Sequence, residues 1–477
     1  MGNRSKVMSE IAANDLDYKN HVPGIPLQQL FDDDLIGPPA AFREESRVSM
    51  GSADLSIERY VSRDWHDREV ERVWRKTWQV ACRLEEIPEI GDYVVYDIVD
   101  DSLIVVRTGA DEIRAYHNAC LHRGNALCLE AGHIGAFRCP FHGFTWSLAG
   151  ELVHIPSQWD FEHVPKDKFC LPQARVDQWG GFVFVNLDPE CAPLADYLEL
   201  LPAHLDGFEL EKRYKAIHVS KVMPCNWKIA QEAFIEGYHV AETHYEKDHN
   251  GNIDPNGIAA MTDDVNMQYD VWAESRHVTR MILASGVQSH YILGHGKPEQ
   301  HVIDVMLGHI PAAERPKIAP GQTARNTLAD YNRTALGKRY GVDLSGASDT
   351  NVLDQVQYTL FPNFTFWPTL FAPLLYRFRP WGNTPDESLM EVYMLYPIPE
   401  DGRDYAPMPE RRLGPDEDWS CVEELAGYGP ILDQDTPNMR RLTKGLKATR
   451  KPGITLGNYQ EARIRHFHRT LEEYLSA

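Results

Sequence analysis

Residues 120–142 read CLHRGNALCLEAGHIGAFRCPFH, and this stretch decides how the rest of the chain is interpreted. Cys120 and His122 stand two positions apart, sixteen residues follow, and Cys139 and His142 then stand three positions apart. Mixtures of thiolate and imidazole bind soft or borderline metals, so a zinc site is one alternative. Zinc fingers usually pair Cys with Cys and His with His, whereas here each segment contributes one of each. That arrangement favours a [2Fe–2S] cluster with two Cys on one iron and two His on the other.

Short runs of alternating or β-branched residues surround this stretch, and Gly, Asp and Pro separate them. They are Asp92–Ile98, Ser102–Thr108, Glu112–Asn118 and Gly180–Leu187. Such runs predict a small all-β domain. Before them, Asp67–Ala81 has helical periodicity, and residues 1–60 are expected to form a polar N-terminal arm. After Pro189 the pattern changes to long strands, at Gln357–Pro380 and Leu389–Tyr396, and then to helices from residue 422 onward. Separate blocks of strands and helices predict an α+β second domain.

A second candidate metal site lies in residues 226–244, which read NWKIAQEAFIEGYHVAETH. Non-haem Fe(II) oxygenases hold iron with two His and one carboxylate on one face, and leave the other face open. His239 and His244 are the candidate imidazoles, and Trp227–Val240 is predicted to be a helix. On an ideal helix the two histidines would lie ~140° apart around the axis. The helix must therefore unwind or bulge after His239, while Glu236 lies one turn before His239 on the same face.

Taken together, these motifs resemble those of the large (alpha) subunit of Rieske-type aromatic-ring-hydroxylating oxygenases. The stretch CLHRGN…CPFHGFTW resembles the Rieske domain, and NWK…E…EGYH…H resembles the iron-binding helix of the same family. The resemblance covers roughly residues 60 to 475. It implies an all-β Rieske [2Fe–2S] domain at residues 61–190. It also implies a helix-grip catalytic domain at residues 191–477, in which C-terminal helices cover an antiparallel sheet.

Rieske proteins of respiratory complexes carry an extra Cys in each cluster loop, and the two form a disulfide. The corresponding positions here are Asn125 and Phe141, so that disulfide cannot form. This departure points to the oxygenase branch of the family. Arg123 and Trp146 resemble the basic and aromatic residues that flank the cluster in that branch, although ordinary loop hydrogen bonding and core packing account for them equally well.

The family's third iron ligand is a carboxylate on a C-terminal helix, after an aromatic-Gly-Pro turn. Here Tyr428-Gly429-Pro430 is followed by two acidic residues, Asp433 and Asp435. Alignment on the pair Asn438-Met439 puts Asp435 in the ligand position and leaves Asp433 as the alternative.

The resemblance also implies a trimer, in which the cluster of one subunit lies beside the iron of the next. His142 of one chain would contact Glu236 of its neighbour, and Glu236 would contact His239. Most family members have Asp at the position of Glu236, so this chain departs from the commonest pattern while keeping a carboxylate. A ferredoxin or an NAD(P)H-dependent reductase would supply electrons, and a small beta subunit can accompany the trimer.

The implied reaction is the mono- or dihydroxylation of an apolar, aromatic substrate with O2, as in aromatic hydrocarbon catabolism. Phe234 and Tyr428 are the candidate pocket residues because they lie near the predicted ligands in the sequence. Two rival hypotheses use the same motifs. A zinc hydrolase would use the two histidines with a carboxylate, and an electron-transfer protein would hold only the cluster.

The composition of the chain limits which binding partners and which cellular location are expected. Acidic residues outnumber basic ones by 70 to 48, and the formal net charge is −22. Nucleic acid is not an expected partner because phosphate binding needs clustered Lys and Arg. The first residues are polar and lack an apolar signal core, and no run reaches the ~18 apolar residues of a membrane span. We therefore expect a cytoplasmic enzyme whose eight cysteines form no disulfide framework.

Overall fold

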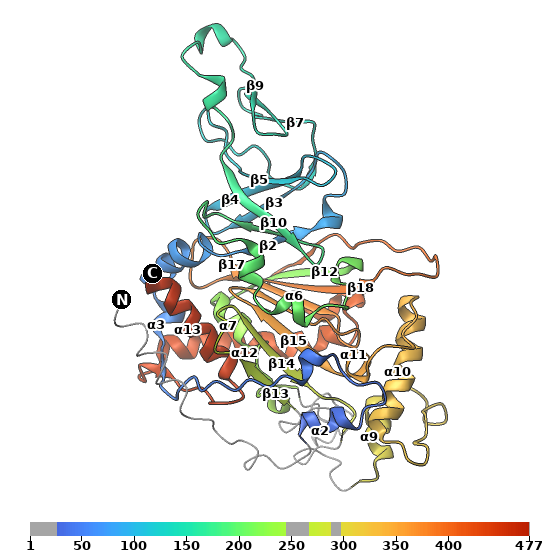
Figure 1. Ribbon diagram of the computed structural model, residues 1–477. Coiled ribbons are helices and arrows are strands. Elements are labelled where there is room, and N and C mark those ends of the chain that lie inside the picture. The colour runs from blue at the N-terminus through green and yellow to red at the C-terminus, as the bar shows by residue number, and fades with distance from the viewer. Residues whose placement is uncertain (1–25, 245–266, 288–296, 477) are drawn as a thin grey trace.

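The structure, a computed structural model, describes residues 26–244, 267–287 and 297–476 (Figure 1). Residues 79–186 form a β-rich unit, seen at the top of Figure 1, around a seven-stranded antiparallel sheet with the order β2-β11-β10-β5-β4-β3-β6. Its strands are β2 (Gln79–Arg83), β3 (Asp92–Ile98), β4 (Asp101–Arg107), β5 (Ile113–His117), β6 (Gly132–His133), β10 (Gln173–Trp179) and β11 (Phe182–Asn186). A three-stranded sheet of β7 (Ala136–Arg138), β8 (Thr145–Ser147) and β9 (Leu152–His154) lies beyond it. The fold confirms the predicted all-β Rieske domain.

The rest of the chain is built on an eight-stranded sheet with the order β13-β14-β15-β16-β17-β18-β12-β19. Its strands are β12 (Arg213–Met223), β13 (Met267–Val271), β14 (Val278–Leu283), β15 (Gln355–Leu360), β16 (Phe364–Phe366), β17 (Leu374–Pro380), β18 (Ser388–Pro397) and β19 (Arg411–Leu413). Neighbouring strands are antiparallel except β12 and β19, which run parallel. The predicted α+β class is confirmed. The long strand expected over Gln357–Pro380 is wrong, because this stretch forms a meander of three strands whose turns contain prolines that cannot donate to a ladder.

Helices cover the large sheet (Figure 1). The ones that concern the metal site are α7 (Trp227–Glu232), α8 (Val240–Thr243), α12 (Tyr428–Ala448) and α13 (Ala462–Ser476). Shorter helices α5 (Leu194–Leu198) and α6 (Leu201–His204) follow the β-rich unit, and α9 (Gln300–Met306), α10 (Ala324–Tyr340) and α11 (Asp349–Leu353) share a separate apolar cluster. None of the helices in the described ranges has the length and apolarity of a membrane span.

The helix expected over Asp67–Ala81 is only partly present. After α3 (Glu58–Val61), helix α4 covers Arg63–Glu69 and continues as one wider π-helical turn over Val70–Trp74. Thr77 closes this turn, because its hydroxyl and its backbone N–H both donate to the carbonyl of Val73 at 2.9 and 3.0 Å. Gln79 then begins β2, whose pairing with β11 overrides the helical periodicity.

The described part of the N-terminal arm packs on the catalytic unit. Helix α2 (Leu27–Asp32) buries Leu27, Leu30 and Phe31, and Asp34 binds Arg325 at 2.7 Å. Strand β1 (Leu55–Ser56) pairs with β20 (Gly453–Ile454), so the arm also reaches the segment before α13. Residues 1–25 of the predicted arm lie outside the described residues.

Candidate metal centres

Two loops of similar geometry bring the predicted cluster residues together. In each loop a glycine N–H donates to the carbonyl of the cysteine four positions earlier, Gly124 to Cys120 at 2.8 Å and Gly143 to Cys139 at 3.0 Å. Both glycines have left-handed backbone angles, with φ of 80° and 76°, which residues with a Cβ rarely adopt. Both thiols are buried and neither is part of a disulfide.

The two predicted imidazoles of these loops lie next to each other. The ring centroids of His122 and His142 are 4.7 Å apart, and the His122 ring stacks on Phe144 at 4.7 Å. His142 is exposed, whereas Nδ1 of His122 is buried and has no hydrogen-bond partner in the described ranges. Two buried free thiols and an unsatisfied imidazole nitrogen are what a Cys₂His₂ iron–sulfur site requires of the protein.

The backbone supports the two thiols in the same way. Burial raises the pKa of the Cys120 thiol, and the backbone N–H groups of His122 and Arg123 oppose this only in part. At Cys139 the backbone N–H groups of Phe141 and His142, with the side chains of Cys120 and Asn125, outweigh burial and lower the pKa. A thiolate is the form that binds iron, so both loops direct backbone N–H groups to the ligand form.

Arg123 and Trp146, the residues predicted to flank the cluster, have different environments. The Arg123 guanidinium is exposed and lies 5.5 Å from the ring centroid of Phe141. Trp146 is fully buried, and its indole N–H donates to the carbonyl of Phe169 at 2.9 Å. Trp146 therefore packs the core beneath the loops, and Arg123 presents a cation at their surface.

The helix predicted over Trp227–Val240 ends early. Helix α7 stops at Glu232, and His239 and His244 stand on either side of the single helical turn α8. The break therefore lies before His239, not after it as the spacing suggested. Side chains from distant segments stabilise it: Gln357 donates to the carbonyl of Phe234 at 2.6 Å, and Arg463 to that of Ile235 at 3.0 Å. These carbonyls thus have hydrogen-bond partners outside any helix.

The break places three predicted ligand atoms at one point. Nε2 of His239 lies 3.3 Å from Nε2 of His244, and Oδ1 of Asp435 lies 3.6 and 3.3 Å from these two nitrogens. Oδ2 of Asp435 is buried and has no hydrogen-bond partner among the residues described. Three donor atoms at these separations fit one metal ion, and two imidazoles with one carboxylate suit non-haem iron.

Each imidazole of this group has a partner for its other nitrogen. Nδ1–H of His239 donates to Oε1 of Glu236 at 2.6 Å, and Nδ1–H of His244 donates to Oε1 of Gln434 at 2.8 Å. Such partners fix the tautomer that leaves Nε2 free to bind a metal. Glu236 makes this contact from a turn and not from a helix face. Its other oxygen accepts the backbone N–H groups of Tyr238 and His239 in the same turn. Sequence reasoning missed Gln434, although it precedes Asp435.

The two candidate carboxylates on α12 have separate environments. Asp433 accepts the backbone N–H groups of Trp419 at 2.7 Å and Ser420 at 3.1 Å, so it anchors the preceding turn. Asp435 points instead to the two histidines. Burial raises the pKa of Asp435 to about 7, and nearby Glu236 adds to the increase against the opposing effect of His239. Among the described residues only the two histidines pair with this carboxylate, and a metal ion would supply the further positive charge.

Comparison with known proteins agrees with this geometry. The family described as ring hydroxylating alpha subunit (catalytic domain) matches residues 207–477, and the Rieske [2Fe-2S] domain matches residues 77–165. The chain belongs to the ring-hydroxylating alpha-subunit family. Its Rieske domain and its non-haem iron catalytic domain imply both predicted cofactors, a [2Fe–2S] cluster and a mononuclear iron.

Relatives of this alpha subunit are both dioxygenases and monooxygenases. It is 34% identical over 191 residues to chlorobenzene dioxygenase subunit alpha of Cupriavidus sp. (strain PS12), an alignment covering 39% of this chain and 42% of the relative. It is 30% identical over 188 residues to the carnitine monooxygenase oxygenase subunit of Escherichia coli (strain K12), covering 39% of this chain and 50% of that relative. The chain thus matches half or less of the length of these relatives.

Two solved structures share the fold of this alpha subunit. Naphthalene 1,2-dioxygenase with indole bound has a TM-score of 0.61 at 20% identity, covering 90% of this chain and 94% of that chain. A quaternary ammonium Rieske monooxygenase with gamma-butyrobetaine has a TM-score of 0.60 at 16% identity, covering 89% and 96%. The two-domain arrangement of Figure 1 is therefore that of Rieske oxygenase alpha subunits.

An apolar cluster packs around α12, the helix that carries Asp435. The predicted pocket residue Phe234 belongs to this cluster, and Tyr428 packs against it. The Phe234 ring packs against Tyr376 at 4.8 Å. Burial, then the neighbouring Tyr428 and Asp435, raise the pKa of Tyr376 well above its usual value. Tyr376 lies on β17, and no sequence pattern predicted it as a pocket residue.

Proposed function

We propose that this chain is the terminal oxygenase component of a multicomponent system. It uses O2 and electrons from NAD(P)H, passed on by a ferredoxin or a reductase, to mono- or dihydroxylate an apolar, aromatic substrate. The observation that carries the proposal is the convergence of His239, His244 and Asp435 in a chain that also has two Cys/His loops. A zinc hydrolase would have no use for a redox cluster, and a pure electron carrier would have no use for the three-residue site.

In this proposal Cys120, His122, Cys139 and His142 hold the cluster, and His239, His244 and Asp435 hold the mononuclear iron. When bound, the cluster supplies single electrons and the iron supplies a site for O2 activation. The protein keeps both imidazoles of the iron site in the Nε2-binding tautomer through Glu236 and Gln434. The protein also keeps Asp435 buried, so that a bound metal ion, and not water, would stabilise the ionised form of this carboxylate.

The separation of the two units within one chain supports a multimer. Strands β7 and β9, near the second cluster loop in the sequence, lie at the far end of the β-rich unit, whereas helices α7 and α12 lie beside the large sheet (Figure 1). We propose a homotrimer, with or without a small beta subunit, in which the exposed His142 of one copy contacts Glu236 of the next. A head-to-tail interface of this kind closes into a ring. An active monomer in light scattering at micromolar concentration would contradict this arrangement.

The aromatic neighbours of the iron site support an apolar, aromatic substrate. Phe234, Tyr376 and Tyr428 supply ring faces and hydroxyl groups. Aromatic faces also attract cations, and one relative is a carnitine monooxygenase oxygenase subunit. The substrate test must therefore include aromatic compounds and a quaternary ammonium compound.

The decisive experiment is O2 consumption by the purified, iron-loaded protein with NAD(P)H and a reductase. The panel would contain an aromatic hydrocarbon, an aromatic acid and a quaternary ammonium compound, each with product analysis by mass spectrometry. The proposal expects O2 uptake coupled to an aromatic compound that gains oxygen. Coupled uptake with the quaternary ammonium compound alone would reject the aromatic assignment. Zinc in place of iron, with hydrolysis of an ester and no O2 uptake, would reject the oxygenase assignment.

A further inference from the structure

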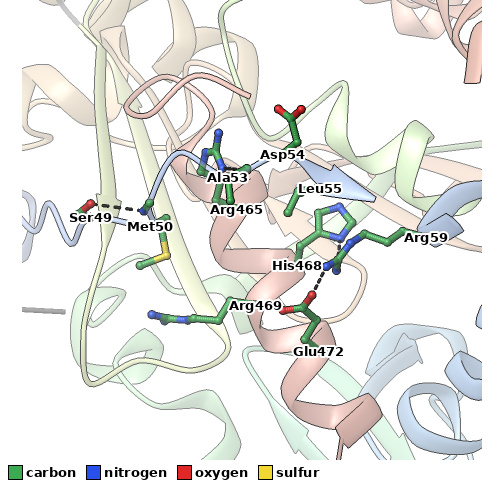
Figure 2. Close-up of a pocket in the computed structure, with 11 residues that line it drawn as sticks. Ser49, Met50, Ala53, Asp54, Leu55, Arg59, Arg465, His468, Arg469 and Glu472 are labelled. Atoms are coloured by element: carbon green, nitrogen blue, oxygen red, sulfur yellow. Dashed lines mark hydrogen bonds and ion pairs between the residues drawn. The ribbon is translucent and has the colours of Figure 1, made fainter. Parts of the chain in front are cut away.

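A cavity of about 490 Å³ lies between the end of the N-terminal arm and the C-terminal helix α13 (Figure 2). Its walls come from residues 49–55, from Arg59 on α3 and from one side of α13. None of the residues that line it is a proposed metal ligand. Sites for small organic molecules usually have volumes of ~300–1,000 Å³, so this cavity has the size of a ligand site.

Among the described residues three arginines line the cavity: Arg59 pairs with Glu472, whereas Arg465 and Arg469 form no ion pair. In Figure 2, Arg469 extends from α13 on the side of Ser49 and Met50, and Arg59 approaches the other side of the helix. Nε of Arg59 and Nε of Arg469 are both buried, and neither has a hydrogen-bond partner in the described ranges. Arg465 donates to the backbone carbonyls of Ala53, Leu456 and Gly457 and not to a carboxylate.

Two of the described residues that line the same cavity are acidic, and both are engaged. Glu472 forms an ion pair with Arg59, and Asp54 binds Lys451, which does not line the cavity, at 2.8 Å. Burial lowers the pKa of both Arg465 and Arg469, and the nearby acidic residues, Glu461 and Asp54 for Arg465 and Glu473 for Arg469, oppose this only in part. The cavity is thus a positive site in a chain whose formal net charge is −22.

We propose that this cavity binds an organic anion, whose carboxylate or phosphate group faces Arg469 while its apolar body contacts Met50, Ala53 and Leu55. The guanidinium fork matches the geometry of both anionic groups. An inorganic ion would fill only a small part of the volume and would leave the apolar wall uncovered. The ligand is therefore expected to carry a hydrocarbon portion.

Isothermal titration of the full-length, metal-loaded protein tests this site with three probes: hexanoate, hexylammonium and inorganic phosphate. Hexanoate should bind, hexylammonium should not, and phosphate should bind more weakly than hexanoate. Arg469→Gln should weaken hexanoate binding about tenfold, because it removes a charge-assisted contact. Arg469 is half-buried, so this variant keeps the fold. Arg72→Gln, at an exposed arginine outside the cavity, is the matched control and should bind normally.

Asp435→Ala separates this cavity from the iron site, since hexanoate should bind that variant as it binds the unaltered protein. The proposal is overturned if hexanoate does not bind or if Arg469→Gln binds it normally. It is equally overturned if Asp435→Ala abolishes binding, which would place hexanoate at the iron. Phosphate binding as tight as that of hexanoate would reject the hydrocarbon portion of the ligand.

Discussion

The two metal centres are built in opposite ways. The cluster loops are local: their four predicted ligands lie within residues 120–142, and two backbone turns of the same kind hold them. The proposed iron centre is assembled from the α7–α8 segment and from α12, with supporting side chains from β15 and α13. A local site depends on its own backbone, whereas an assembled site depends on side chains far away in the sequence.

The largest expected effect concerns the local site. Cys139→Ser and His122→Ala should each abolish the visible absorption of the cluster and all turnover, because a missing ligand cannot be replaced within the loop. The mononuclear iron should remain, at about one iron per chain. Visible spectroscopy with iron analysis checks this. Cys170→Ser, at an exposed cysteine, is the control. Unchanged absorption in both loop variants would exclude the Rieske assignment of these residues.

Glu236→Gln should lower turnover about 10- to 100-fold while leaving iron content, cluster spectrum and oligomeric state normal. A carboxylate accepts on two oxygens, but the amide of glutamine has only one. The contact to the His239 imidazole or the contact to the backbone is therefore lost. The measurement is cluster reoxidation in a single turnover with a pre-reduced protein, substrate and O2. Glu211→Gln, at an exposed glutamate, is the control. Reoxidation at the normal rate in Glu236→Gln would show that Glu236 is not on the electron route.

Gln434→Leu should weaken iron binding about tenfold, because His244 loses the acceptor that orients its ring. Gln434→Glu keeps an acceptor and is the matched control, with iron retention close to normal. Iron remaining after dialysis against a chelator measures the difference. Equal retention in both variants would mean that the neighbouring segments, and not this hydrogen bond, orient His244.

The smallest effects are expected from the glycine turns of the cluster loops. Alanine at either position costs ~1–2 kcal/mol of unfolding free energy, because the backbone is left-handed there. Gly143→Ala should cost more than Gly124→Ala. A Cβ at residue 143 would lie 3.2 Å from both Arg138 Nη2 and Pro156 Cγ, and a Cβ at residue 124 meets nothing within 4 Å. Loss of cluster absorption during denaturation measures the unfolding free energy of both variants. A larger loss in Gly124→Ala than in Gly143→Ala would contradict this account of the loops.

The same contrast explains what sequence reasoning could predict. The cluster residues could be proposed at once because their spacing is short, and the α+β class followed from blocks of strands and helices. The iron histidines could be proposed too, but the position of the helix break could not be predicted. That break depends on Gln357 and Arg463, which lie more than a hundred residues later in the chain and carry no local signal. Gln434 and Tyr376 were missed for the same reason, since only the packed structure brings them to the iron residues.

Local periodicity also predicted a helix that extends further than the one in the structure. Trp78 continued the apolar side of the Asp67–Ala81 pattern, but it precedes β2, whose partner β11 is about a hundred residues away. A distant strand decided the conformation of this segment, as distant side chains decided that of the α7–α8 segment.

The most direct test of the assembled iron centre is the iron content of Asp435→Ala beside that of Asp433→Ala. The unaltered protein should hold about three irons per chain, two in the cluster and one mononuclear. Asp435→Ala should hold about two, with an unchanged cluster spectrum and no turnover. Asp433→Ala should keep about three, because that carboxylate binds the backbone of Trp419 and Ser420. An Asp435→Ala protein with all its iron, beside an Asp433→Ala protein that has lost one, would contradict the proposed ligand set.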